Sequence, residues 1–484
     1  MGQTWSGLSI WEVRTTGSDT NGGGFVGSAG SDYTQQNSPQ YSGTDLEVNS
    51  SNNLQVKSTT AGSPVAADVG NVICISAGTF WTTGWYEIQS QDGTWWTLDR
   101  SPNAAGSTGG TFAVGGALAS PGLAGWIAQN YYSSNNRRGR VYIESGTYTV
   151  TNSTAGLSQK NLNGPRCMWI GYDQTYGRNS KPATNPLIQS DSSFTGRLAD
   201  IGYNTNVSYV SGEITWVDFD GGSYTTDGSG VVRAPQLLYQ CTVRGGVNRT
   251  YSGSHGCKTV DCQIYGTHIT TYKTCVSGGY HYYSYIDGDS GGYRGRVFQA
   301  DGHGCIIVGS TNGGGNNHYA CAIQRQGMIS NSIIVAKSSA AINPDDGTFV
   351  NNLILSTSTS NYLYSAGASG GVSTGHRFNN YHYGFNTSSG TPVYTGSATQ
   401  HQNPVALSAD PCVDLAGGDY TLDPSSAAFS TLRGIPDISK PYGFDGGAMV
   451  GPGVDVTTIS SSGSGSGSGS SYTPAASAKF TRLE

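Results

Sequence analysis

Charge is scarce in this sequence. Charged side chains make up only 12% of the 484 residues, about half of the ~25% that globular proteins usually carry. The net charge is −6, and lysine and arginine form no stripe, which excludes the clustered positive charge that nucleic-acid binding requires. Disorder is excluded as well, because disordered chains are poor in aromatic residues and this chain has 30 tyrosines.

Long apolar stretches are also missing. No run approaches the ~18 residues of a membrane span, and residues 1–11 contain neither the basic segment nor the apolar core of a secretory signal. The sequence therefore predicts no membrane span and no signal peptide. A surface-type composition without a signal favours a protein that is released by lysis and lies on the surface of a virion.

Metal-binding and common catalytic patterns are absent too. The nine cysteines include no CxxC pair, no cysteine–histidine set has zinc spacing, and no HExxH occurs. We therefore predict no metal site, no cofactor and buried free thiols. The serine-protease-like segment 288–292 has no histidine motif upstream to serve as its base, so we interpret it as a glycine-rich turn.

The feature that is present is an internal repeat. A five-residue pattern begins with a small residue or cysteine, has a β-branched or aromatic residue third, and ends on a small residue. It recurs about every 22 residues, which is typical of one coil of a parallel β-helix. Alternate residues of a strand share a face, so the first and third positions are expected inside. The pattern occupies residues 217–221, 241–245, 262–266, 284–288, 305–309, 332–336, 352–356 and 380–384.

The repeat predicts an all-β chain built on a right-handed parallel β-helix solenoid. We expect a small N-terminal β head or cap domain with strands at 71–75, 85–88 and 94–98, and a short helix within 117–130 that plugs the open end. A flexible C-terminal tail follows a serine–glycine linker, and it is either a docking peptide or a frayed terminus. The expected units are 1–120 (head), 121–400 (β-helix), 401–458 (closing segment, with a strand pair between 412 and 422), 459–471 (linker) and 472–484 (tail).

Three segments carry a resemblance to a known family. The opening at 11–24, the coil pattern at 141–148 and the closing stretch at 409–422 resemble phage-encoded parallel β-helix proteins of the pectin-lyase-like class. The resemblance spans roughly residues 10 to 450 and implies the fold. Members of this class include tail spikes, virion decorations and polysaccharide-cleaving enzymes, so the resemblance carries over no catalytic residue.

Two aspartates form the one plausible catalytic pair. Asp218 and Asp220 share the outward face of one strand and are about 6.6 Å apart, within the ~5–9.5 Å that glycoside hydrolysis uses. Arg244, expected one coil away, would neutralise Asp220. The alternative is that both are solvated charges on the sheet surface.

Tyrosines on the outside of the coils are candidates for sugar binding, because a tyrosine ring combines a flat apolar face with a hydroxyl group. Packing along the ladder of stacked strands is the alternative explanation. The candidate binding residues are Tyr265, Tyr282, Tyr285 and Asp287.

The outward positions of the later coils are aliphatic. An exposed patch of this size usually marks an interface, so we expect it to form a homotrimer. The alternative is that a loop or the C-terminal segment covers it. The predicted interface residues are Ile306, Val308, Ile333, Val335, Leu353 and Leu355.

Together these features favour a phage virion structural protein, such as a tail spike, fibre or capsid decoration, rather than an enzyme. It would present its β-helix surface to host-surface polysaccharide and attach to other virion proteins through one terminus. One alternative is a polysaccharide depolymerase, either a glycoside hydrolase or a lyase, on the same scaffold. A second is a bacterial surface adhesin, which would need a route of export.

Overall fold

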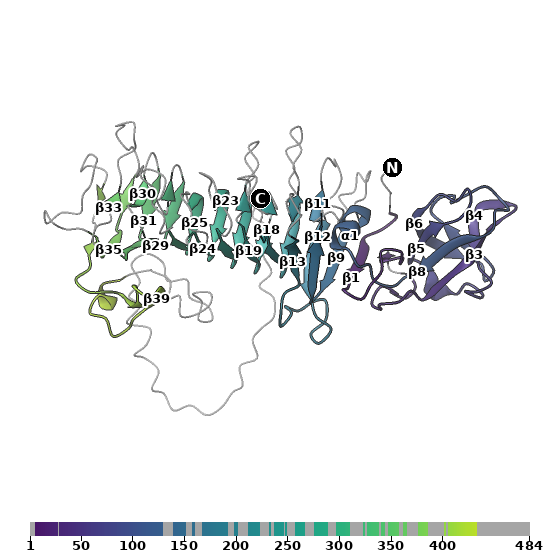
Figure 1. Cartoon of the computed structure of the whole chain (residues 1–484), viewed down its shortest axis with the longest axis horizontal. Coiled ribbons are helices and arrows are strands. Elements are labelled where there is room, and N and C mark those ends of the chain that lie inside the picture. The colour runs from purple at the N-terminus through teal and green to yellow at the C-terminus, as the bar shows by residue number, and fades with distance from the viewer. Residues whose placement is uncertain are drawn as a thin grey trace, which may run out of the picture.

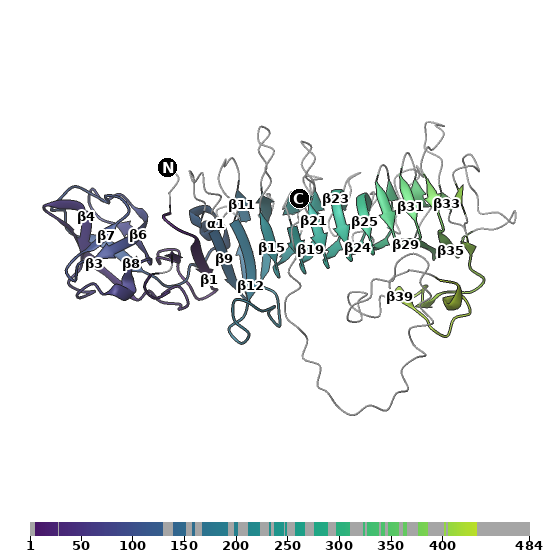
Figure 2. The same ribbon diagram turned by 180° about the vertical axis from the view of Figure 1, so that it is seen from behind.

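The computed structural model places the repeat in a rod of stacked coils with a small barrel at its N-terminal end (Figures 1 and 2). The structure describes residues 5–27, 29–128, 139–151, 157–159, 167–191, 198–201, 212–222, 232–233, 237–245, 247–248, 257–266, 275–288, 297–309, 323–324, 327–337, 340–343, 347–357, 362–364, 376–385, 401–402 and 405–432. The predicted linker 459–471, the tail 472–484 and Cys321 lie outside these residues.

The rod is a parallel β-solenoid with three faces, and each full coil runs through face 3, face 2 and face 1 in turn. Face 1 is one parallel sheet of eleven strands. Its strands are β10 (Thr147–Val150), β13 (Leu187–Ser190), β16 (Asp218–Asp220), β19 (Thr242–Arg244), β22 (Gln263–Tyr265), β24 (Tyr285–Asp287), β26 (Ile306–Val308), β29 (Ile333–Ala336), β32 (Leu353–Ser356), β35 (Tyr381–Tyr383) and β37 (Val405–Ala406).

Faces 2 and 3 share two long strands, whose first halves lie in face 3 and whose second halves lie in face 2. These are β23 (Val276–Tyr282) and β25 (Phe298–His303). The other strands of face 2 are β1 (Ser9–Val13), β9 (Gly139–Glu144), β12 (Cys167–Tyr172), β15 (Glu213–Thr215), β18 (Leu237–Tyr239), β21 (Lys258–Val260), β28 (Met328–Ser330), β31 (Thr348–Val350), β34 (Arg377–Phe378) and β36 (His401–Gln402). Those of face 3 are β11 (Leu157–Gln159), β14 (Ala199–Ile201), β17 (Val232–Arg233), β20 (Val247–Asn248), β27 (Ile323–Gln324), β30 (Ala340–Asn343) and β33 (Tyr362–Tyr364).

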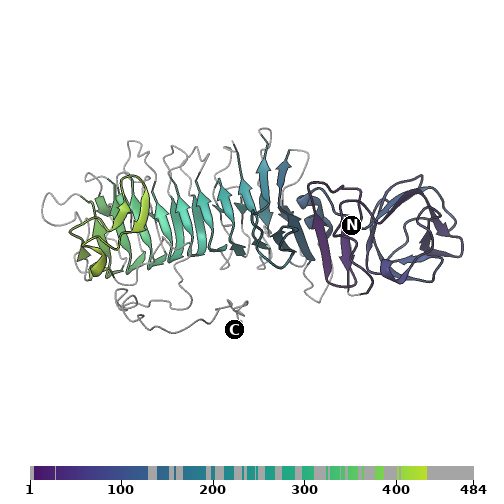
Figure 3. The same cartoon turned by 90° about the horizontal axis from the view of Figure 1, so that it is seen from below.

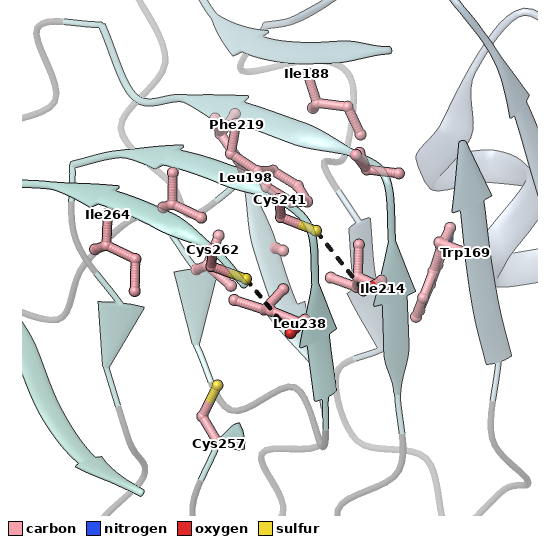
Figure 4. Packing of buried hydrophobic residues seen from close by; sticks show 14 of the residues in the cluster. Trp169, Ile188, Leu198, Ile214, Phe219, Leu238, Cys241, Cys257, Cys262 and Ile264 are labelled. Atoms are coloured by element: carbon pink, nitrogen blue, oxygen red, sulfur yellow. Dashed lines mark hydrogen bonds between the residues drawn. The ribbon is translucent and has the colours of Figure 1, made fainter. Parts of the chain in front are cut away.

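The eight repeat segments are eight consecutive strands of face 1, from β16 to β35, paired in parallel in the expected order. The prediction of a parallel β-solenoid is confirmed. First and third positions point inward as predicted, and all eight cysteines in the described residues are buried free thiols. The third-position side chains that stack in the core are Phe219, Val243, Ile264, Ile286, Ile307, Ile334 and Ile354. Figure 4 shows part of this stack.

The corner between face 2 and face 1 repeats one backbone conformation. Seven residues that are not glycine have φ between +50° and +58° there, a left-handed state that costs about 1–3 kcal/mol at each such position. Gly304 takes the same place in its coil with φ +64°, and a Cβ on it would lie 2.6 Å from the ring of Tyr283. The seven residues are Trp216, Gln240, Asp261, Tyr283, Asn331, Asn351 and Asn379.

The inward residue that follows the corner connects its coil to the preceding one wherever it is polar or a cysteine, which excludes only Val217. The thiol of Cys262 donates to the carbonyl of Leu238 at 3.4 Å, which Figure 4 marks with a dashed line. Further along, the amide of Asn352 donates to the carbonyl of Ile329 at 3.0 Å, while its Oδ1 accepts the N–H of Ser332 at 2.9 Å. Buried backbone groups that the sharp corner leaves outside the sheet ladders thus find partners.

The N-terminal barrel is closed by six antiparallel strands in the order β3-β4-β7-β6-β5-β8. Its core is separate from that of the solenoid and centres on Trp96, Tyr86 and Phe112. The three strands predicted in this region coincide with β5, β6 and β7. The barrel strands are β3 (Tyr41–Asn49), β4 (Asn52–Lys57), β5 (Val72–Ala77), β6 (Gly84–Gln91), β7 (Trp96–Leu98) and β8 (Gly110–Val114), with a 3-10 turn, η1, at Ala66–Asp68.

The first strand, β1, belongs to the solenoid rather than to the head that the sequence predicts over residues 1–120. β1 pairs in parallel with β9 and antiparallel with β2 (Gly24–Val26), so the barrel is an insertion after the first strand of face 2. The expected plug is the helix α1 (Pro121–Ala128), which packs against β1 and β9 at the open end.

Buried charged side chains connect β1 to the segment after β12. Glu12 on β1 is fully buried and accepts hydrogen bonds from Arg14 at 3.0 Å and from Arg178 at 2.8 Å. Arg178, in the segment after β12, also binds Asp32 at 2.7 Å. Burial raises the pKa of Glu12 despite both arginines. Breaking such a buried network is costly, so these contacts hold the insertion in place.

The C-terminal segment 405–432 folds back onto the outside of the later coils (Figures 1 and 3). It begins with β37, the last strand of face 1, and continues with the predicted strand pair β38 (Cys412–Asp414) and β39 (Asp419–Leu422) and the 3-10 turn η4 (Phe429–Thr431). We call residues 407–432, the part after β37, the cover. Its residues Cys412, Leu415, Tyr420, Leu422 and Leu432 form one apolar cluster with face 1.

The cover corrects the predicted interface. Five of the six aliphatic residues are fully buried, namely Val308, Ile333, Val335, Leu353 and Leu355, and Ile306 is half-buried against the same cluster. Burying a Val, Leu or Ile side chain yields about 1.5–3 kcal/mol, so the chain uses this patch to hold its own C-terminal segment. The homotrimer stays a prediction, but the aliphatic patch that suggested it is buried under the cover.

One core histidine predicts a pH dependence of stability. His281 is buried, its Nδ1 lies 2.8 Å from the hydroxyl of Thr259 and its Nε2 lies 3.1 Å from the carbonyl of Gly278. Burial lowers its pKa to about 4, from ~6.5 in the unfolded chain. The unfolded state therefore binds more protons between these values, and stability falls as pH falls from ~6.5 to ~4.

We expect the wild-type chain to lose up to about 3 kcal/mol over this window through His281, measured as urea unfolding midpoints at pH 7 and pH 4. His281→Gln should lack this loss. Burial raises the pKa of Asp261 to about 6, so this carboxyl group makes the folded state more stable as pH falls. Its effect is the same in the wild type and in the variant. Equal pH dependence of wild type and variant would contradict the assignment.

Candidate functional site

The outward positions of face 1 form two columns that run along the rod. In the first column Asp218, Thr242, Gln263 and Tyr285 follow one another coil by coil, and in the second Asp220, Arg244, Tyr265 and Asp287 do so. Towards the C-terminal end both columns continue beneath the cover. We call the part next to the cover the aromatic face; it consists of Arg244, Gln263, Tyr265, Tyr285 and Asp287.

The aromatic face is held together by its own contacts. The guanidinium carbon of Arg244 lies 5.5 Å from the ring centre of Tyr265, and the rings of Tyr265 and Tyr285 lie 6.0 Å apart at 55°. Tyr265 donates to Gln263 at 3.1 Å, and Tyr285 lies 3.4 Å from Asp287. Such contacts restrict the side chains before any ligand arrives.

Both phenols of the aromatic face remain protonated at neutral pH. Burial raises the pKa of Tyr265, and burial together with the nearby carboxylate of Asp287 raises that of Tyr285. Arg244 and Gln263 are exposed, while the two tyrosines and Asp287 are half-buried. The face therefore offers flat rings flanked by hydrogen-bond donors and acceptors.

The predicted aspartate pair lies on one strand, but each carboxylate has a local structural role. Asp218 accepts the backbone N–H of Thr242 at 2.7 Å and the side-chain amide of Asn185 at 2.9 Å. Asp220 accepts the N–H of Gly222 at 2.9 Å. Asp218 thereby connects its coil to the next one and to the segment before β13.

Tyr282 is separated from the other candidates. It lies on β23 in face 2, where it pairs with Val260 and His303, whereas Tyr265 and Tyr285 are in face 1. The corner at Tyr283 turns the chain between Tyr282 and Tyr285, so two tyrosines three positions apart reach different faces. Tyr282 therefore does not share a face with Tyr265 and Tyr285, and its role in binding stays a prediction.

The side chains of the left-handed corner residues form a column of their own, which the five-residue pattern does not predict. Trp216 donates to Gln240 at 2.8 Å, and Gln240 donates to Asp261 at 2.7 Å. Asn185 donates both to Asp218 and to the carbonyl of Gln240, which brings a distant segment onto this corner. The sequence signal was the residue directly before each repeat, a position that the five-residue pattern leaves out.

Within the described residues, no group of three or more His, Cys, Asp and Glu side chains is arranged to hold a metal ion. Among the same residues, no helix has the length and hydropathy to cross a membrane. The predicted turn at 288–292 is described only at Gly288, where a Cβ would lie 2.2 Å from Val297. Ser290 lies outside the described residues.

Comparisons with known proteins yield structural similarities only. No family model and no curated protein matches the chain. One solved structure that resembles it is the ORF18 protein of Geobacillus virus E2, with 15% identity and a TM-score of 0.29 over 57% of this chain and 54% of that one. A second is the A-module of the Azotobacter vinelandii mannuronan C-5 epimerase AlgE4, with 13% identity and a TM-score of 0.27 over 55% of this chain and 86% of that one. A third is the Agl-KA catalytic domain, with 11% identity and a TM-score of 0.25 over 83% of this chain and 92% of that one.

The chain spans about half the length of the phage protein that it resembles. At TM-scores this low the similarities carry no argument about function. The solenoid itself rests on the pairing of the strands described above.

The contacts of Asp218 predict a structural role that can be measured. Asp218→Ala leaves the N–H of Thr242 and the amide of Asn185 without their acceptor, so we expect a loss of about 1–3 kcal/mol in the free energy of unfolding. Asp220→Ala, on the same strand, removes one hydrogen bond at a turn and should cost less. Urea unfolding of both variants compares the two, and equal losses would contradict the assigned role.

Proposed function

We propose that this chain is a structural component of a bacteriophage particle whose solenoid binds a host-surface polysaccharide at the aromatic face. The phage assignment rests on the resemblance of the opening, coil and closing segments, and on the composition. The binding assignment rests on the aromatic face. The observation that carries it is the contact between the tilted rings of Tyr265 and Tyr285, which lie on neighbouring coils beside Arg244.

The chemistry of the aromatic face suits a sugar chain. Tyrosine rings pack against the apolar faces of pyranose rings, while Gln263 and Asp287 provide acceptors for sugar hydroxyls. Coils are spaced by ~4.8 Å, close to the length of one sugar unit, so a chain lying along the rod meets successive coils with successive units. The exposed guanidinium of Arg244 favours an acidic sugar next to Tyr265.

No contact of Asp218 or Asp220 favours glycan cleavage over glycan binding, because both carboxylates are engaged in holding the backbone. The depolymerase hypothesis stays a prediction, as does the adhesin hypothesis. Attachment through one terminus to other virion proteins belongs to the proposal. It requires that the protein be found in purified phage particles.

Glycan binding is tested with a panel of purified acidic and neutral bacterial capsular polysaccharides, by isothermal titration. We expect the wild-type chain to bind at least one acidic member. Tyr265→Ala should weaken that binding about tenfold, because it removes a stacking contact of about 1.4 kcal/mol. Arg244→Gln should reduce the preference for acidic over neutral chains.

Tyr176→Ala is the matched control. Tyr176 is 58% exposed and lies in the segment after β12, away from the aromatic face, so its loss should leave binding unchanged. Tyr285 is unsuitable for truncation because it also packs against the cover. A wild-type chain that binds no member of the panel, or Tyr265→Ala with unchanged affinity, would contradict the proposal.

A further inference from the structure

Face 2 carries a second exposed column that the proposed function does not use. One outward residue from each of seven consecutive coils lies in register, from β15 to β31. Tyr280, at its centre, is 42% exposed and Met328 is 52% exposed. The column, which we call the face-2 column, consists of Glu213, Leu237, Lys258, Tyr280, Asp301, Met328 and Thr348.

The order of residues in the face-2 column is self-complementary when reversed. With Tyr280 opposite Tyr280 of a second copy, Lys258 lies opposite Asp301 and Asp301 opposite Lys258. One coil further out on each side, Leu237 lies opposite Met328. Apolar side chains therefore meet apolar ones, opposite charges meet, and Glu213 lies opposite the uncharged Thr348.

A parallel arrangement of two face-2 columns would bring like charges together. In register, Lys258 would face Lys258 and Asp301 would face Asp301, and like charges directly opposite one another are unfavourable. Asp301 is also held in place, because its Oδ1 accepts the N–H of Met328 at 2.6 Å. The charge pattern thus selects an antiparallel pairing about a two-fold axis.

The second outward column of face 2 is compatible with the antiparallel pairing. It carries no lysine, arginine or carboxylate, so its reversal brings no like charges together. It is centred on Tyr282, in the same coil as Tyr280. The residues of this column are Thr215, Tyr239, Val260, Tyr282, His303, Ser330 and Val350.

We infer that face 2 is the interface of a two-fold symmetric dimer, in which a second copy of this chain lies antiparallel with Tyr280 on the symmetry axis. Seven coils give a contact about 30 Å long. The aromatic face is on face 1, so it stays accessible in both copies, and the inference is independent of the proposed glycan binding.

The test is sedimentation of the full chain across a range of concentrations, at low and at high salt. We expect a monomer–dimer equilibrium that weakens with salt, because two ion pairs contribute to it. Lys258→Glu should weaken the dimer about tenfold or more, since it places a glutamate opposite Asp301 twice in each dimer. Asp301→Lys should weaken it similarly.

Mixing the two variants is the sharpest experiment. A chain with Lys258→Glu and a chain with Asp301→Lys have opposite charges at both contacts of an antiparallel pair, so the mixture should form heterodimers as strong as the wild-type dimer. Thr348→Ala is the matched control and should dimerise like the wild type. Circular dichroism checks that each variant is folded.

Asp301→Lys removes the acceptor of the Met328 N–H, so a second probe is needed in case this variant misfolds. Tyr280→Cys places two thiols at the two-fold axis, where a short bismaleimide should join two copies. Thr348→Cys lies three coils from the axis, so its two thiols would be about 29 Å apart and should give no covalent dimer above the wild-type background. A monomer at all concentrations, a trimer, a mixture that forms no heterodimer, or equal cross-linking of both cysteine variants would each overturn the inference.

Discussion

The corner between face 2 and face 1 is the constraint on which the rest of the molecule depends. Eight coils turn there through a left-handed residue such as Gln240 or Asn351, and the polar or cysteine residue that follows forms a hydrogen bond to the backbone of the preceding coil, as Cys262 and Asn352 do. These bonds between coils offset part of the strain of the turn. Coils therefore stack in one register, which aligns the outward columns on both faces.

The coil repeat could be predicted because its signal lies in the core. Inward positions such as Cys262 and Ile264 are restricted to small or branched residues by stacking, and this restriction recurs in the sequence. The solenoid, the inward thiols and the strands of face 1 follow from it. The antiparallel barrel after β1 has no such period, and the parallel pairing of β1 with β9 spans more than a hundred residues of sequence.

The outward surface could be predicted only in part, because sequence periodicity does not show what covers a side chain. The aliphatic residues around Leu353 and the tyrosines around Tyr265 occupy equivalent outward positions, yet the cover buries the first group and leaves Tyr265 half-buried. Tyr282 was grouped with Tyr265 and Tyr285 for a different reason, because the left-handed residue Tyr283 turns the chain between them. The first outcome depends on tertiary contacts and the second on a backbone conformation, and the hydrophobic pattern shows neither.

The inward orientation of the first residue of each repeat is tested most directly by the reactivity of the cysteine thiols at that position. Mass spectrometry of the chain treated with a maleimide, native and in denaturant, reports each cysteine separately. Cys241, Cys262 and Cys305 are all buried beside carbonyls of neighbouring residues and of the preceding coil, so we expect them to stay unmodified in the native chain and to react fully once it is unfolded. Rapid labelling of these three thiols in the native chain would show that they do not point into the solenoid.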